Sequence, residues 1–315
     1  MLSIKSGEHI ANVVKGKKVV KSIYLNDINT NDNDAVDLSN VINNDDRMPR
    51  SFYTSQRGIT PANMLILKRA IRMNSNEIIP KLHASMLEAF KQAQIILKEL
   101  ALKTIVVKPD EGALQLIPSD KHFAIAVYGP SGVGKSHWVG KFMIEYRHKY
   151  KKDCDIYVFS SIIDDPAFVK ANPTYIKIDD SVITDPFSIQ EFGLNKHNLV
   201  VFDDIESLNE LHYKAISEFR NKALECGRHQ KIDIIAIHHV IQANIATKKI
   251  QNECDISVVF PRCNFASIEK LLRNCYGFGK DDIAYVKELG KRSRYAIIKR
   301  SYPSYVLGEQ DIRII

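Results

Sequence analysis

Eight residues form the most specific chemical pattern in the chain, G-x-x-x-x-G-K-[ST], which runs from Gly129 to Ser136 directly after an apolar run. Its glycines let backbone N–H groups turn inward around phosphate oxygens, along a path that a Cβ atom would obstruct. Lys135 can then reach the β- and γ-phosphates of a nucleotide, and the Ser136 hydroxyl can ligate Mg2+. We therefore predict a phosphate-binding loop that contacts ATP through Gly129, Pro130, Ser131, Gly132, Val133, Gly134, Lys135, Ser136 and His137.

Two acids follow a second apolar run that ends at Phe202. Ligands of parallel sheets gather at the carboxyl ends of the strands, which is where Asp203 and Asp204 would lie. We expect Asp203 to hold Mg2+, directly or through water, and Asp204 to orient and deprotonate the attacking water. Glu206 competes with Asp204 as the base, and the spacing does not choose between them.

Two histidines end the apolar run that begins at Ile232. His239 can hydrogen-bond the γ-phosphate or the attacking water and so report hydrolysis. The alternative is that His238 and His239 are solvated loop residues. A zinc site is disfavoured because no further Cys or His lies at metal-ligand spacing.

An arginine precedes the same run, in Gly227-Arg228-His229. At the amino end of a strand Arg228 cannot readily reach its own nucleotide, but it can reach the site of a neighbouring subunit in a ring. There it would neutralise developing phosphoryl charge. A surface arginine that caps a turn is the alternative, and Arg262 and Lys248 are other candidates for the trans-acting cation.

Short apolar runs alternate with helical segments from about residue 123, which is typical of a parallel sheet covered on both faces. The predicted strands are 123–128, 155–160, 175–178, 198–202, 232–238 and 255–260, and the predicted helices are 135–149, 208–226, 265–275 and 280–289. The run 294–307, around Tyr302-Pro303, predicts a terminal hairpin. These elements define a predicted α/β domain over residues 119–315.

Residues 1–118 read as a mixed N-terminal extension. Short apolar stretches among lysines in residues 1–25 predict edge strands. Thirteen of the twenty-one residues from Asn26 to Asp46 are Asn or Asp, which favours a linker. Two amphipathic helices are predicted after it, one from Thr60-Pro61 and one over residues 80–103.

The amino-acid composition argues against a membrane-spanning protein and against a secreted one. The chain has 315 residues, 45% hydrophobic and 26% charged, and no apolar run of about 18 residues, so we expect no membrane span. From the sequence MLSIKSGEHI at its start we expect no secretion signal, and five cysteines without a Cys-x-x-Cys pair favour a reducing compartment. The net charge of 44 − 37 = +7 permits a polyanionic partner.

Taken together, these motifs resemble the viral DNA-packaging ATPases of the FtsK/HerA superfamily, of the poxvirus type and most of all those of virophages and polinton-like viruses. The resemblance covers about residues 120–262. Its specific parts are Gly227-Arg228-His229, the polar residue that ends the next strand, and Asn252-Glu253 before the last strand. Many relatives carry glutamine at the strand end, whereas this chain has His239, with Gln242 three residues on.

The resemblance implies an additional-strand, RecA-like P-loop NTPase core with a mostly parallel sheet flanked by helices. It also implies a homo-oligomeric ring, Mg2+-dependent ATP hydrolysis and translocation of double-stranded DNA into a preformed capsid, with capsid vertex proteins as further partners. The protein would then work in the host cytoplasm or a viral factory, or associated with the virion.

Candidate DNA contacts are Lys291, Arg292 and Arg294, which fall in a stretch without acids from Leu289 to Leu307. A solvated basic face is the alternative. Two other functions stay open: a stand-alone P-loop phosphotransferase or kinase that uses Lys135 and Asp203, and a nucleotide-switch scaffold protein of capsid assembly.

Overall fold

A computed structural model describes residues 2–4, 7–25, 103–193, 197–241 and 245–315. The predicted linker 26–46, the two predicted helices within 60–103 and Gln242 lie outside the described residues. The chain divides into two compact units. The first comprises Met1–Gly7 and Tyr24–Val106, and the second comprises Glu8–Ile23 and Val107–Ile315. The predicted division between residues 118 and 119 stays a prediction.

The second unit is built on a parallel sheet in the order β11-β6-β10-β9-β7-β8. Its strands are β6 (Ala124–Tyr128), β7 (Cys154–Ser160), β8 (Thr174–Ile176), β9 (His197–Asp203), β10 (Ile232–His238) and β11 (Ile256–Val259). Every residue of β6, β10 and β11 is buried, as expected for strands covered on both faces. Strand β10 lies between the strand that precedes the phosphate loop and the strand that ends in Asp203. This inserted strand confirms the additional-strand P-loop fold class.

Helices α5 (Lys135–Tyr150) and α7 (Glu210–Gln230) cover opposite faces of this sheet. The crossover from β6 to β7 and the crossover from β9 to β10 run in opposite directions along the strand order, and right-handed crossovers then place their helices on opposite sides. Burial agrees, because Ala124, Ala126 and Tyr128 share one core cluster with side chains of α7. The alternating residues of β6, Ile125 and Val127, point to the other face.

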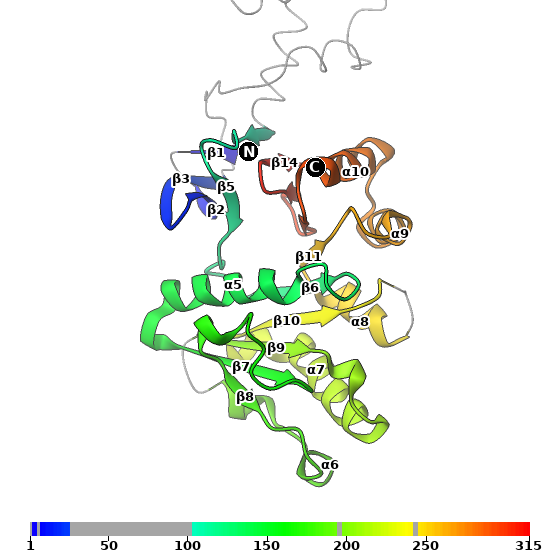
Figure 1. The fold of residues 1–315 in the computed structure, drawn as a ribbon. Helices are drawn as coiled ribbons and strands as arrows, with labels where there is room; N and C mark the ends of the chain where they lie inside the picture. Colours follow the sequence, from blue (N-terminus) through cyan, green and yellow to red (C-terminus); the bar gives the residue numbers. More distant parts are fainter. Residues whose placement is uncertain (1, 5–6, 26–102, 194–196, 242–244) are drawn as a thin grey trace, which may run out of the picture. The chain divides into compact units, whose positions relative to one another are not determined.

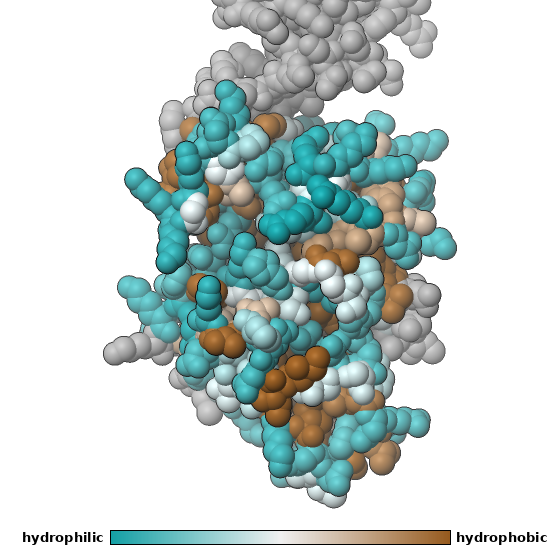
Figure 2. Space-filling view, in the orientation of Figure 1, coloured by the Kyte–Doolittle hydropathy of each residue, from teal (hydrophilic) through white to brown (hydrophobic). Residues whose placement is uncertain are grey.

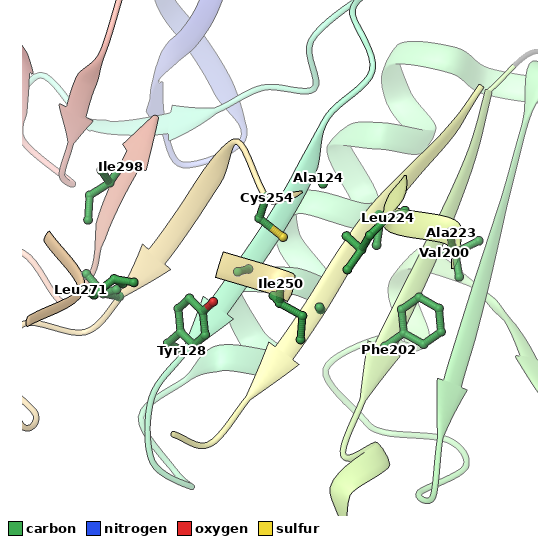
Figure 3. Packing of buried hydrophobic residues seen from close by; sticks show 14 of the residues in the cluster. Ala124, Tyr128, Val200, Phe202, Ala223, Leu224, Ile250, Cys254, Leu271 and Ile298 are labelled. Carbon is green, nitrogen blue, oxygen red and sulfur yellow. The ribbon is translucent and has the colours of Figure 1, made fainter. Parts of the chain in front are cut away.

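The core on the α7 side extends across the strands of the parallel sheet. Figure 3 shows Ala223 and Leu224 of α7 near Val200, and Ile250 of helix α8 (Ile245–Glu253) near Tyr128 and Cys254. Short helices complete the connections: α6 (Ser181–Thr184) and the 3-10 turns Lys151–Asp153, Val169–Ala171, Ile189–Phe192 and Ile205–Ser207. Helix α8 is missing from the predicted elements.

The C-terminal region extends the sheet with antiparallel strands β12 (Ala296–Lys299), β13 (Tyr305–Leu307) and β14 (Asp311–Ile314). The predicted terminal hairpin is therefore confirmed as β12 and β13, and β14 is an addition. Helices α9 (Phe265–Tyr276) and α10 (Lys280–Arg292), orange in Figure 1, match the predicted segments.

Strands form the described N-terminal part. In the first unit, β1 (Leu2–Ser3) pairs antiparallel with the last two residues of β3 (Lys18–Leu25), and β4 spans Thr104–Val106. In the second unit, β2 (Glu8–Lys15) lies between the first part of β3 and β5 (Ala113–Leu116). Residues 1–25 thus contain strands as predicted, but not all of them are edge strands, because β2 has a hydrogen-bonded neighbour on each side.

Candidate active site

The phosphate loop joins β6 directly to α5. Gly132 and Gly134 have φ of 80° and 100°, where a side chain is strained, and open space surrounds the position of a Cβ at each. A Cβ on Gly129 would lie 2.9 Å from Val133 Cγ2 and 3.1 Å from Phe260 Cδ2. The three glycines are thus required by the backbone path and by packing, and the loop has the open concave shape that phosphate oxygens need.

Lys135 is buried at the first residue of α5. Its Nζ donates to the carbonyl oxygens of Gly129 at 2.8 Å and Pro130 at 3.1 Å, and lies 3.3 Å from His239 Nδ1. Burial lowers the pKa of Lys135, and the nearby charges of Asp204 and Asp203 oppose that shift. The ammonium therefore stands between the loop and the acids of β9.

The two acids differ in their surroundings. Asp203 ends β9 and is buried, and that burial, with the charges of Asp204 and Asp165, raises its pKa to about 7. Asp204 has φ 52° and ψ 25°, a left-handed conformation that Asp and Asn tolerate best among residues with a side chain. Its Oδ1 accepts from His239 Nε2. The turn at Asp204 thus directs a half-buried carboxylate toward the loop while Asp203 stays inside.

Replacing Asp203 with asparagine should raise the melting temperature of the protein at pH 8 when EDTA keeps metal away. The raised pKa means that the folded state holds more protons than the unfolded state between about pH 4 and pH 7, so the wild type loses stability as pH rises through that window. The variant has no such loss, and the two melting temperatures should converge below pH 4. Asp281→Asn, on the exposed first turn of α10, is the control. A difference that stays constant with pH would contradict this account.

His239 links Lys135 to Asp204. An ammonium only donates, so the His239 ring accepts at Nδ1 and therefore donates from Nε2 to the Asp204 carboxylate. His238 points into the interior, where it is 2% exposed and its Nδ1 pairs with Glu206 Oε1. Burial works to raise the pKa of Glu206, but the hydrogen bond and charge of His238, a backbone hydrogen bond and the charge of His239 together outweigh it, and the pKa is lowered. His238 is therefore not a solvated loop residue, and His239, in the bend after β10, is partly exposed but contacts both Lys135 and Asp204.

One cleft brings the predicted residues together. It is lined by Ser131, Gly132, Gly134, Lys135, Ser136, His137, Asp203, Asp204 and His239, and by Asp165, which sequence reasoning missed. Glu206 is not among its lining residues. Asp165 comes from the loop after β7, where its Oδ1 accepts from Ala167 N at 2.8 Å. Asp165 follows the rule that ligands gather at the carboxyl ends of parallel strands. Sequence reasoning missed it because four residues separate it from the end of β7.

The predicted trans-acting cations and the predicted DNA contacts do not line the phosphate cleft. Arg228 is exposed in the last turn of α7, by the amino end of β10. Arg262 donates to the carbonyl oxygens of Gly290 and Lys291, and Lys248 is exposed on α8.

The three predicted DNA contacts in the acid-free stretch from Leu289 to Leu307 form ion pairs with acids that lie just before or after it in the sequence. Lys291 is 74% exposed beside Glu288, Arg292 pairs with Asp311, and Arg294 pairs with Glu309.

Arg292→Ala should destabilise the fold by about 1–3 kcal/mol, because it leaves the buried Asp311 carboxylate without its cation. Tyr285 Oη, which donates to the same oxygen at 3.1 Å, remains but carries no charge. The neighbouring Lys291→Ala should change the free energy of unfolding by less than about 0.5 kcal/mol, because its ion pair is exposed. Urea denaturation of both variants measures the difference, and equal effects would argue against a structural role for Arg292.

The donor set fits a magnesium nucleotide. Mg2+ is usually held by one or two carboxylates together with substrate phosphates, and Ser136 and Asp203 line the same cleft as the phosphate loop. Among the described residues, no cluster of three or more His, Cys, Asp or Glu side chains is arranged to hold a metal ion. Within the same ranges, no helix is long and apolar enough to cross a lipid bilayer.

The chain was compared with family models, with solved structures and with curated proteins. No family model matches it. Solved structures that resemble it include the conjugation coupling protein TcpA of pCW3 with ATPγS (13% identity, TM-score 0.46, 66% of this chain and 65% of that one). Another is the genome packaging NTPase B204 from Sulfolobus turreted icosahedral virus 2 with AMP, with 11% identity, a TM-score of 0.38, and coverage of 56% of this chain and 92% of that one. A third is Thermomonospora curvata EccC, with 10% identity, a TM-score of 0.37, and coverage of 74% of this chain and 49% of that one.

A relative in sequence is the uncharacterized protein V3 of the Sputnik virophage. The two are 30% identical over 194 residues, which make up 61% of this chain and 76% of V3. The likeness to virophage proteins expected from the motifs is thereby confirmed, and this chain belongs to the same protein family as V3.

Proposed function

We propose that this chain is an ATPase that packages double-stranded viral DNA, hydrolysing ATP in a homo-oligomeric ring. The observation that carries the ATPase part is the single cleft in which the phosphate loop, Lys135, Asp203, Asp204 and His239 converge. Two acids at the end of the second strand favour water as the acceptor over a kinase substrate, because one can hold the metal while the other takes a proton.

Each side chain has a proposed role. The loop N–H groups and Lys135 hold the β- and γ-phosphates and balance the charge that develops on them. Asp204 accepts the proton of the attacking water, and His239 keeps that carboxylate oriented through its Nε2–H. Ser136 and Asp203 would hold Mg2+, which supplies further positive charge against the phosphates.

The DNA and ring parts of the proposal are supported by the resemblance to packaging ATPases and by the net charge of +7. Ile162 and Ile163 are 51% and 63% exposed, in the loop that also carries the cleft residue Asp165. Figure 2 shows hydrophobic surface, in brown, in the lower part of this face, where Figure 1 places α6. The surface at α6 is separate, because the cavity there shares no residue with the phosphate cleft. The exposed Ile162 and Ile163, on the loop that carries a cleft residue, suit a subunit interface. Across such an interface Arg228 of one subunit would reach the nucleotide of the next.

The test is steady-state ATP hydrolysis with and without double-stranded DNA. A translocase should be stimulated several-fold by duplex DNA, and less by heparin, which controls for general polyanion binding to a basic protein. A phosphotransferase would be indifferent to DNA, and a nucleotide switch would turn over slowly in all conditions. Absence of stimulation at low salt, with hydrolysis intact, would refute the translocase and keep the ATPase.

A further inference from the structure

A β-hairpin formed by β2 and β3, blue in Figure 1, carries four lysines at and beside its turn. Lys15, Lys17 and Lys18 are exposed, and Lys21 is partly exposed. The sequence holds no acid between Glu8 and Asp27, and none of the four lysines has an ion pair within the described residues. Residues 15–21, the hairpin tip, therefore present four positive charges that the described part of the chain leaves unpaired.

The hairpin tip differs in this respect from the basic stretch 289–307. Arg292 and Arg294 of that stretch pair with Asp311 and Glu309. A cation with an acid partner has to leave or share that partner before it binds a phosphate, whereas an unpaired lysine releases only water and counterions. The lysines of the hairpin tip are therefore better placed to bind a polyanion than the arginines of the basic stretch.

The base of the hairpin is held firmly while its tip is free of packing. Strand β2 pairs with β5 from Ala11 to Val14, and Leu114 N of β5 donates to the carbonyl oxygen of Glu309 at 2.7 Å. In the turn, Gly16 has φ 64°, and a Cβ added there would meet no atom within 4 Å. A fixed base limits the motion that the tip loses when it binds a partner, which favours binding.

Protection of a strand edge explains only part of this charge. Lysines on an edge strand block pairing with other chains, and this role would account for Lys18 and Lys21, because β1 pairs with only the last two residues of β3. It does not account for Lys17, which lies in the turn, or for Lys15, whose strand β2 lies between β3 and β5. The charge of the hairpin tip therefore points to a binding role.

The arrangement of side chains along β3 favours a nucleic acid over a lipid surface. Successive residues of a strand point to opposite faces, so Lys18 and Val20 share one face and Val19 and Lys21 share the other. An element that lies on a membrane gathers its apolar side chains on one face, and this hairpin does not. A two-stranded ribbon with cations on both faces suits the major groove of DNA, which admits such a ribbon between two rows of phosphates.

We propose that the hairpin tip contacts the phosphates of double-stranded DNA. The inference rests on the proposed function, because it takes duplex DNA as the partner of the ATPase. No residue of the tip lines the phosphate cleft, so removal of its lysines should leave ATP hydrolysis without DNA unchanged. Stimulation of hydrolysis by DNA should be lost, because the contact that reports DNA is then gone.

The test is binding of a fluorescent duplex to the full chain, followed by anisotropy over a series of NaCl concentrations. A triple variant with Lys15→Ala, Lys17→Ala and Lys18→Ala should bind at least about tenfold more weakly at low salt. The slope of log K against log salt should become shallower by about 2.7, because each of three lysines accounts for about 0.9.

The matched control is a triple variant that also removes three exposed lysines without ion pairs, Lys222→Ala on α7, Lys270→Ala on α9 and Lys280→Ala on α10. It loses the same net charge, so it should keep the wild-type slope if position matters and not only total charge. Circular dichroism checks that both variants are folded.

The outcomes separate this proposal from the proposed function. If wild type binds the duplex and the tip variant binds it with the same affinity and slope, the hairpin assignment is wrong and the translocase stands. If the tip variant loses DNA binding but wild-type hydrolysis is not stimulated by DNA, the hairpin contact stands and the translocase fails. If wild type does not bind duplex DNA at low salt, both fail.

A lipid partner is tested with the same proteins. Vesicles of phosphatidylcholine and phosphatidylserine should bind wild type and the tip variant equally weakly in a sedimentation assay. If the tip variant lost vesicle binding and kept DNA binding, the hairpin would bind an anionic lipid surface, and the proposal would be overturned.

Discussion

Replacing Lys135 with alanine should lower the rate of ATP hydrolysis on the order of 10³-fold, the scale expected when one preorganised charge is removed from a transition state. The ammonium is buried and is supported by two loop carbonyls and His239, so water cannot replace it in the same place. Its loss also removes a charge that lowers the pKa of Asp203, so the carboxylate proposed to hold Mg2+ becomes harder to ionise. Steady-state phosphate release measures the effect.

Lys270→Ala is the matched control, because Lys270 is exposed on α9 and does not line the phosphate cleft. It should hydrolyse ATP at the wild-type rate. Equal rates for Lys135→Ala and wild type would mean that the phosphate loop takes no part in hydrolysis, and the assignment of the whole cleft would then fail. Circular dichroism of both variants separates loss of chemistry from loss of fold.

The parts of the site that follow from local sequence could be predicted, and the parts that depend on tertiary packing could not. Gly129 to Ser136 is a contiguous motif whose function requires a strand before it and a helix after it, and β6 and α5 flank it. Asp203 and Asp204 directly end a buried strand, so the rule on strand ends places them. Asp165 obeys the same rule, but its loop has to fold back before it reaches the cleft.

The histidines show why residue spacing alone left alternatives open. Adjacent residues at a strand end face opposite sides, so His238 turns inward to Glu206 while His239 turns to Lys135 and Asp204. Which acid each histidine contacts depends on where β9 and the turn after it lie beside β10, and residue spacing does not give that position. The basic stretch 289–307 is similar, because the acids that pair with Arg292 and Arg294 follow it in the sequence and return through β14 and the turn before it.

Element types were predicted well where the pattern was long or wholly apolar. All six predicted strands of the parallel sheet are present, and β6, β10 and β11 are buried along their whole length, whereas β8 is short and partly exposed. Helix α8 was missed because it is nine residues long and its sequence, IATKKIQNE, has few apolar positions. The order of the strands in the sheet could not be predicted from hydrophobic periodicity. That order depends on which strands pair, and β10 pairs with β6 and β9, which are distant from it in the sequence.

Asp204→Asn should lower the hydrolysis rate by about 10²–10⁴-fold and leave ATP affinity near that of the wild type, because it removes the proposed base and little else. Asparagine keeps an oxygen that can accept from His239, and it tolerates the left-handed conformation at φ 52°. Alanine would add backbone strain, so asparagine is the cleaner change. Single-turnover hydrolysis and calorimetric ATP binding measure the two quantities separately.

Glu206→Gln is the paired variant that decides between the two candidate bases. Glu206 is absent from the lining of the phosphate cleft, and its Oε1 meets the buried His238, a contact that a glutamine oxygen can keep. It should therefore retain most of the hydrolysis rate. If Glu206→Gln lost activity and Asp204→Asn kept it, the base would be Glu206. The turn after β9 would then have to rearrange when nucleotide binds, because the 3-10 turn Ile205–Ser207 holds that carboxylate against His238.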